Sequence, residues 1–175
     1  MRRFLAFLAL MVAWTLADST PYTLQGRVVY EGRAPLGSWK GENPTLEGQV
    51  AWDKATGALR GRVCLDQRRW DSGEPLRDSH TRKLFEVDRY PQACLELEGL
   101  EGPVPGPVTI RGVLEIHGVK KPVRISGEVQ AQGKALIFQG GFTTRITDWG
   151  MTPPSLMGMR VRDEVQVQIW AEVRP

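Results

Sequence analysis

The chain has 175 residues and a formal net charge of +3 at pH 7. Without Arg2 and Arg3 at its start, 21 basic residues face 20 acidic ones. This near balance, with no basic cluster interleaved with aromatic residues, argues against a nucleic-acid partner. The length corresponds to one domain that can bury a sizeable core.

The N-terminus has the pattern of a secretory signal peptide. Arg2 and Arg3 precede an uncharged run from Phe4 to Ala17. As a helix, fourteen residues rise about 21 Å, which is short of a hydrocarbon core of roughly 30 Å. We predict a signal peptide over residues 1–17 and a mature domain over residues 18–175, periplasmic or secreted and without a transmembrane span. The alternative is an uncleaved membrane anchor.

Most of the remaining chain alternates apolar and polar residues with a period of two. This pattern is typical of half-buried antiparallel strands, which present one apolar face to a core. In chain order, the segments are a weaker one from Tyr22 to Tyr30, then 45–52, 59–66, 92–98, 108–117 and 123–129, a weaker one from Leu136 to Thr147, and 164–173. Hairpin loops are expected at Asp53–Gly57, His117–Gly118 and Gln132–Lys134.

The alternation stops between Gln67 and Pro91. Asp78 is expected to cap a short helix that continues through Arg82 to Leu84, and Pro91 ends the segment. Because this segment lies between two strands, it reads as an insertion and not as a helical layer over a sheet.

Eight short strands without a helical layer must close on themselves or stack as two sheets. We therefore predict an all-β fold, an eight-stranded antiparallel barrel with a short helical insertion between residues 67 and 91. A barrel of this size can hold one small ligand. An immunoglobulin-like sandwich is the alternative, but no Trp lies between cysteines at the usual spacing.

Residue patterns for catalysis and metal binding are weak. Ser79 and His80 are adjacent in the expected helix and point in different directions, so they cannot form a hydrogen-bonded catalytic pair. His117 precedes a glycine and reads as a turn residue. The G-x-S-x-G, C-x-x-C and H-E-x-x-H motifs are absent from the sequence. We predict a non-enzyme without a metal or cofactor.

The two cysteines, Cys64 and Cys94, lie on the polar faces of the strands that flank the irregular segment. In an exported protein, outward cysteines on neighbouring strands suggest a disulfide. Two free thiols are the alternative.

Three segments carry a family resemblance. The run RDSHTRKLFEVDRYP, from Arg77 to Pro91, resembles the R-D-x-H … F-[DE] … Y-P signature of the YceI-like family. The run LEIHGVKKPV, residues 114–123, is similar to that family's L-x-[IL]-x-G-V-x-[KR]-P-V hairpin, and FTTRITDWGM, residues 142–151, is similar to its D-[FW]-G-[LM] turn. Two departures are the missing K-H-x-G-type motif in residues 32–41 and Thr81 in place of a frequent Leu.

The resemblance implies a lipocalin-like barrel in the periplasm that encloses a polyisoprenoid, such as an isoprenoid quinone, for storage, transport or stress protection. It implies no metal and no catalytic residue. Phe85 and Tyr90 would pin the insertion over one barrel end, while Arg145 and Asp148 would fix the turn before Gly150. The motif residues are Asp78, His80, Tyr90, Pro91, Gly118, Arg145, Asp148 and Gly150.

A prenyl chain lacks polar groups, so its affinity must come from burial of apolar area. The expected lining of the tunnel is Val50, Trp52, Val63, Leu65, Phe85, Leu95, Ile110, Leu114, Ile116, Ile125, Phe138, Phe142, Val165, Val167 and Ile169. A filled core would use the same residues. The alternative function is therefore a stress-linked exported barrel that acts through a protein partner, for which Trp170 on the polar last strand is a hint. The sequence leaves open whether the protein forms a homodimer.

Overall fold

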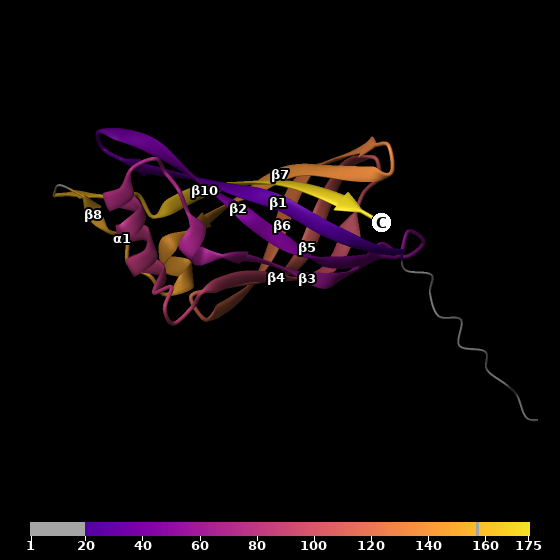
Figure 1. The fold of residues 1–175 in the computed structure, drawn as a ribbon, viewed down its shortest axis with the longest axis horizontal. Helices are drawn as coiled ribbons and strands as arrows, with labels where there is room; N and C mark the ends of the chain where they lie inside the picture. Colours follow the sequence, from indigo (N-terminus) through magenta and orange to yellow (C-terminus); the bar gives the residue numbers. More distant parts are fainter. Residues whose placement is uncertain (1–19, 157) are drawn as a thin grey trace, which may run out of the picture.

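The computed structural model describes residues 20–156 and 158–175, so the predicted signal peptide lies outside the described residues. Eight antiparallel strands close into a barrel (Figure 1). Each barrel strand pairs with the next barrel strand along the chain, and the last one, β10, pairs with β1. The barrel confirms the predicted fold and excludes the sandwich. The strands are β1 (Thr20–Ala34), β2 (Gly37–Trp52), β3 (Ala58–Asp66), β4 (Gln92–Glu101), β5 (Gly106–Ile116), β6 (Val119–Gln132), β7 (Ala135–Arg145) and β10 (Glu164–Arg174).

The two barrel ends differ. One end, which we call the helix end, carries α1 and β8, as Figure 1 shows. The other end, which we call the mouth, carries the C-terminus, the start of β1 and the β6–β7 turn. The short elements outside the barrel strands are η1 (Gln67–Arg69), α1 (Pro75–Phe85), η2 (Ile146–Trp149), β8 (Ser155–Leu156) and β9 (Met159–Arg160).

The first hairpin is longer than the alternation predicted. β1 and β2 remain paired as far as Ala34 and Gly37. Gly41 lies opposite Tyr30, and a Cβ on Gly41 would sit 2.2 Å from the Tyr30 ring. Trp39 covers Gly32 in the same way. The glycines leave room for cross-strand aromatic rings, so this segment is a strand although its sequence lacks apolar–polar alternation.

The helix begins earlier than expected, and the predicted cap is wrong. Glu74 is the N-cap, and its carboxylate accepts a hydrogen bond from the Leu76 N–H at 3.1 Å. Pro75 suits the first helical position because it has no N–H to leave unpaired. Asp78 is instead buried in the first turn and accepts hydrogen bonds from the N–H and hydroxyl of Ser72, which fasten the preceding loop to the helix.

Candidate functional site

The barrel encloses a cavity of about 300 Å³, lined by inward-facing side chains from all eight barrel strands together with η1, α1 and η2. No Lys, Arg, His, Asp or Glu lines it in the described part of the chain. Across residues 20–156 and 158–175, no group of three His, Cys, Asp or Glu side chains is placed to hold a metal ion. The cavity can therefore take an apolar molecule, but it offers no charge to hold an ionic one.

All fifteen residues of the predicted tunnel line this cavity. The period-two pattern located the fourteen that lie on strands, because alternate residues of a strand share one face. Phe85, in the helical insertion, was expected from the family resemblance. The sequence reading missed the lining at the helix end, where Trp39, Gln67, Trp70, Thr81 and Trp149 contribute. These residues lie in the first hairpin and in segments without alternation, so no sequence signal marked them as inward-facing.

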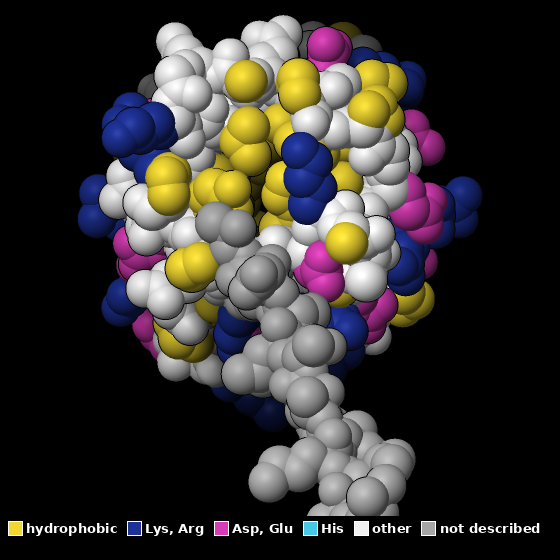
Figure 2. Space-filling model, turned by 90° about the vertical axis from the view of Figure 1, so that its right-hand side faces the viewer, with side chains coloured by type: hydrophobic (Ala, Val, Ile, Leu, Met, Phe, Trp, Pro, Cys, Tyr) yellow, Lys and Arg dark blue, Asp and Glu magenta, His cyan; other side chains and the backbone are white. Residues whose placement is uncertain are grey.

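The mouth carries an apolar rim. Figure 2 looks onto this end and shows hydrophobic side chains gathered around a hollow. Tyr22 and Trp52 lie near the start of β1 and the end of β2, and Val173 lies near the C-terminus; all three line the cavity. An apolar molecule can therefore reach the interior through this end.

Aromatic packing joins the helix end to the barrel. Trp149 is 2% exposed and forms a buried cluster with Ile146, Met151 and Val161. Its indole N–H donates to the Thr144 hydroxyl at 2.9 Å. Phe85, the last residue of α1, packs against this cluster, so it lies where the predicted pinning role requires.

His117 links three segments that the sequence reading left separate. Its φ of 54° places it in the predicted β5–β6 turn. Its Nδ1 lies 3.1 Å from the Trp149 carbonyl oxygen, and its Nε2 lies 2.5 Å from the carboxylate of Glu86, the C-cap residue of α1. The Tyr90 ring contacts His117 edge-on and lies so close to Gly118 that a Cβ there would be 2.8 Å away. The turn therefore holds the helix against η2.

The turn before Gly150 is held differently from the prediction. Arg145 and Asp148 are exposed, and in the described part of the chain neither side chain forms a hydrogen bond or ion pair there. The Asp163 carboxylate instead accepts from the Thr147 N–H at 2.8 Å and the Thr147 hydroxyl at 2.6 Å. These hydrogen bonds lower the pKa of Asp163. Its carboxylate thus stabilises the fold above the ordinary aspartate pKa, and this contribution is lost as the pH falls through the lowered value.

The remaining motif residues surround the insertion. The Pro91 carbonyl accepts from the Gln67 N–H at 2.8 Å, which brings the two ends of the insertion together. His80 is exposed on α1 and is not part of the cavity lining.

None of the described helices has the length and hydrophobicity of a membrane span.

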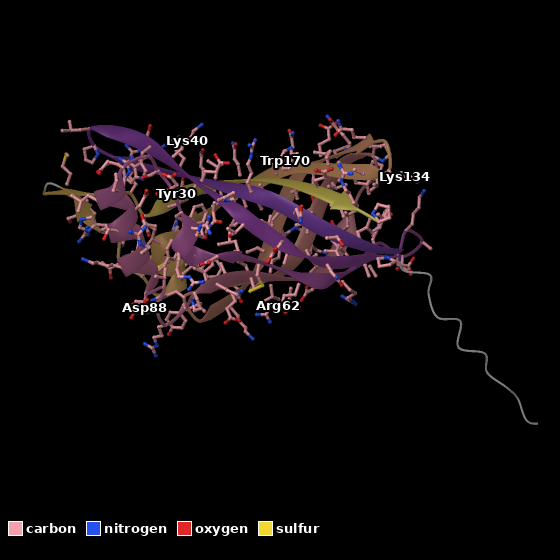
Figure 3. All side chains as sticks on the ribbon, in the orientation of Figure 1. Tyr30, Lys40, Arg62, Asp88, Lys134 and Trp170 are labelled. Carbon is pink, nitrogen blue, oxygen red and sulfur yellow. A yellow bond between two sulfur atoms is a disulfide. The ribbon has the colours of Figure 1, made fainter. Side chains whose placement is uncertain are left out.

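Cys64 and Cys94 are directly opposite each other in β3 and β4 and form a disulfide, so the free-thiol alternative does not hold in this structure. Figure 3 shows the sulfur–sulfur bond on the outside of the barrel near Arg62. The bond closes the base of the segment that carries η1 and α1.

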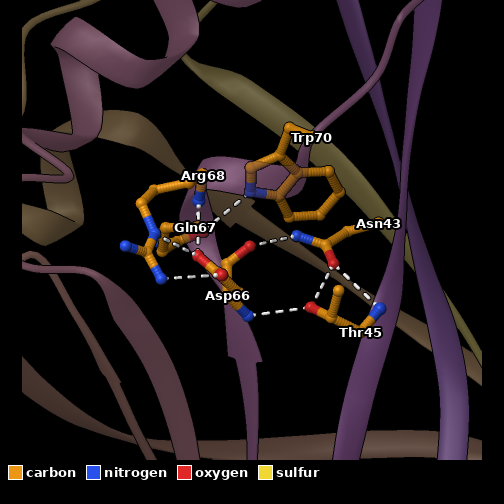
Figure 4. Close-up of polar contacts among 6 residues, drawn as sticks. All are labelled: Asn43, Thr45, Asp66, Gln67, Arg68 and Trp70. Atoms are coloured by element: carbon orange, nitrogen blue, oxygen red, sulfur yellow. Dashed lines mark hydrogen bonds and ion pairs between the residues drawn. The ribbon is translucent and has the colours of Figure 1, made fainter.

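Side chains replace the strand ladder beside this disulfide, where β2 and β3 separate (Figure 4). The amide of Asn43, which is fully buried, donates to the Asp66 carbonyl at 2.8 Å, and the Asp66 N–H donates to the Thr45 hydroxyl at 2.8 Å. Arg68 hydrogen-bonds the Asp66 carboxylate and lowers its pKa. These contacts keep the barrel wall continuous next to the helix end.

Solved structures share this fold at low sequence identity. BcnA from Burkholderia cenocepacia superposes with a TM-score of 0.73 at 19% identity, covering 86% of this chain and 96% of that one. A polyisoprenoid binding domain from Saccharophagus degradans, implicated in plant cell wall breakdown, gives 0.68 at 15% identity, covering 87% and 97%. The YCEI protein of Campylobacter jejuni gives 0.65 at 18% identity, covering 78% and 84%.

Sequence comparison agrees with the fold. A UPF0312 protein of Azotobacter vinelandii is 29% identical over 115 residues, which cover 61% of this chain and 60% of that protein's length. The model of the YceI-like domain matches residues 25–173, which is most of the chain. The chain therefore belongs to the YceI-like domain family.

Proposed function

We propose that this protein binds a long isoprenoid lipid, such as an isoprenoid quinone or another prenyl lipid, inside the barrel for storage, transport or stress protection. One observation carries the proposal: the cavity is lined by all eight strands and by no charged side chain in the described residues. Each buried CH₂-sized group of a prenyl chain contributes about 0.8 kcal/mol. A ligand without polar groups along its chain suits such a lining, because no partner has to be supplied for it.

Two further observations support lipid binding. The barrel resembles the polyisoprenoid binding domain of S. degradans, although at 15% identity that likeness concerns the fold. The cavity itself favours a bound ligand over the alternative of a filled barrel that acts through a protein partner. Trp170, the hint for that alternative, is partly covered, because the Arg27 guanidinium lies 5.7 Å from its ring centroid. The proposed role is binding, without catalysis and without a cofactor.

Organic extraction with native mass spectrometry tests the proposal. After expression in a host that makes long isoprenoids, the folded protein should carry an extra mass that disappears on extraction and matches a prenyl lipid in the extract. A spectrum with only the mass of the mature chain would contradict the proposal and favour the filled-barrel alternative.

We also propose that the protein acts in the periplasm or outside the cell. The basic start and the run from Phe4 to Ala17 support export, and cleavage after Ala17 should leave a mature chain that begins near Asp18. N-terminal sequencing of protein recovered from the periplasm or medium measures this start. Recovery of a chain that still begins at Met1 would rule out cleavage and indicate a membrane anchor.

A further inference from the structure

Hydrogen-bonding groups gather at the helix end of the otherwise apolar cavity. Tyr30 lines the cavity there, with its ring over Gly41 and edge-on to Trp70 at a centroid distance of 5.2 Å. Its hydroxyl oxygen is buried, and no group in the described part of the chain hydrogen-bonds it. Figure 3 shows Tyr30 on the side of the molecule nearer α1. A buried hydroxyl without a partner is unfavourable, so a bound acceptor would improve this site.

Gln67 provides a second polar group in the lining of the cavity. Its side chain is 2% exposed and lines the same cavity. Its carbonyl oxygen accepts from the Trp70 indole N–H at 2.7 Å, so the amide nitrogen remains as a donor (Figure 4). Trp70 contacts both side chains, Tyr30 through its ring and Gln67 through its indole N–H. A ligand must bring an oxygen acceptor to match them.

The charge of the lining restricts which oxygen can bind. No cationic side chain of the described residues lines the cavity. A phosphate or diphosphate would lose its water there without a counter-ion, whereas a carbonyl or hydroxyl oxygen needs only one donor. The cluster therefore fits an uncharged oxygen.

At the mouth, the indole N–H of Trp52 has no hydrogen-bond partner among the described residues. This residue ends β2, and its indole nitrogen is as buried as the Tyr30 hydroxyl. The helix end offers a lipid head group the Tyr30 hydroxyl and the Gln67 amide, whereas Trp52 offers one N–H. We therefore place the head group of the lipid at the helix end and its tail toward the mouth.

We propose that Tyr30, assisted by Gln67, binds an uncharged carbonyl or hydroxyl oxygen at the head of the isoprenoid, so that the lipid lies head-inward with its tail toward the mouth. This inference rests on the proposed lipid-binding function. It predicts a preference for prenyl alcohols and quinones over prenyl diphosphates and over hydrocarbons of equal length.

The test compares Tyr30→Phe with the parent and with Tyr22→Phe. Phenylalanine keeps the ring packing at position 30 and removes only the hydroxyl, and Tyr22 is a cavity-lining tyrosine at the mouth. The probes are geranylgeraniol, its diphosphate and the hydrocarbon of the same skeleton, each titrated by quenching of tryptophan fluorescence. One net hydrogen bond corresponds to about a three- to tenfold change in affinity. Tyr30→Phe should therefore weaken geranylgeraniol binding by that factor and leave hydrocarbon binding unchanged.

Several outcomes would overturn the inference. These are an unchanged affinity for geranylgeraniol in Tyr30→Phe, an equal loss for the hydrocarbon, a matching loss in Tyr22→Phe or Trp52→Phe, or tighter binding of the diphosphate by the parent. Equal affinity of the parent for all three probes also removes the head site but leaves lipid binding standing. If the parent binds none of them, the proposed function itself fails.

Discussion

Phe142→Glu is expected to abolish lipid retention while the barrel remains folded. Phe142 lies on β7, lines the cavity and packs against the buried cluster around Val108 and Phe138. A carboxylate at this position must either lose its hydration or keep water in the lipid's path. Since about 1.4 kcal/mol corresponds to a tenfold change in affinity, we expect lipid occupancy to fall at least tenfold. Extraction and native mass spectrometry of the purified variant measure this occupancy.

The neighbouring residue provides the matched control. Thr143 is exposed on the outer face of the same strand, so Thr143→Glu introduces the same charge outside the barrel. It should retain the lipid at the parent level. Circular dichroism must show strand content in both variants, and Phe142→Leu tests whether loss of the ring alone matters. Equal lipid content in folded Phe142→Glu and Thr143→Glu would place the lipid outside this cavity.

Loss of the disulfide is expected to lower the free energy of unfolding by roughly 3 to 4 kcal/mol in the chain-entropy model. The bond joins residues separated by 30 positions, and this loop contains η1 and α1. Without the bond, the unfolded chain gains freedom, and the base of the helix end depends on strand pairing and on the Gln67–Pro91 hydrogen bond. Urea unfolding of a Cys64→Ser/Cys94→Ser double variant measures the loss.

Reduction provides the control for this prediction. A thiol reductant should lower the urea midpoint of the parent toward that of the double variant and should leave the variant unchanged. Thiol titration of the denatured, unreduced parent should detect no free cysteine. An identical midpoint for the oxidised and reduced parent would show that the bond does not constrain the unfolded chain.

The inward faces of the strands could be predicted from the sequence because strand alternation is a local property. Val50, Ile125 and Val167 face the cavity because neighbouring residues of a strand point to opposite sides. The turns at His117–Gly118 and Asp53–Gly57 were equally local, since glycine tolerates the positive φ of 73° at Gly118 and 74° at Gly57.

The helix start was mispredicted because two carboxylates compete for similar roles. Both Glu74 and Asp78 could accept N–H groups, and single-residue preference favours Asp as a cap. Pro75 at the first helical position and the Ser72 contact to Asp78 decided the outcome. Those contacts depend on the path of the loop before the helix, which no periodic pattern describes.

The sequence by itself determined the strand faces, the main turns and the uncharged character of the predicted tunnel lining. Only the tertiary structure decided that these faces enclose a space. The same apolar residues could fill a core, and the closure of β10 on β1 sets how far apart they lie. The tertiary structure also brought together residues distant in sequence, such as His117 with Glu86 and Trp149. It placed the Tyr30 ring against Trp70, with no hydrogen-bond partner for its hydroxyl in residues 20–156 and 158–175. Such contacts depend on strand register and barrel closure, and therefore on the whole fold.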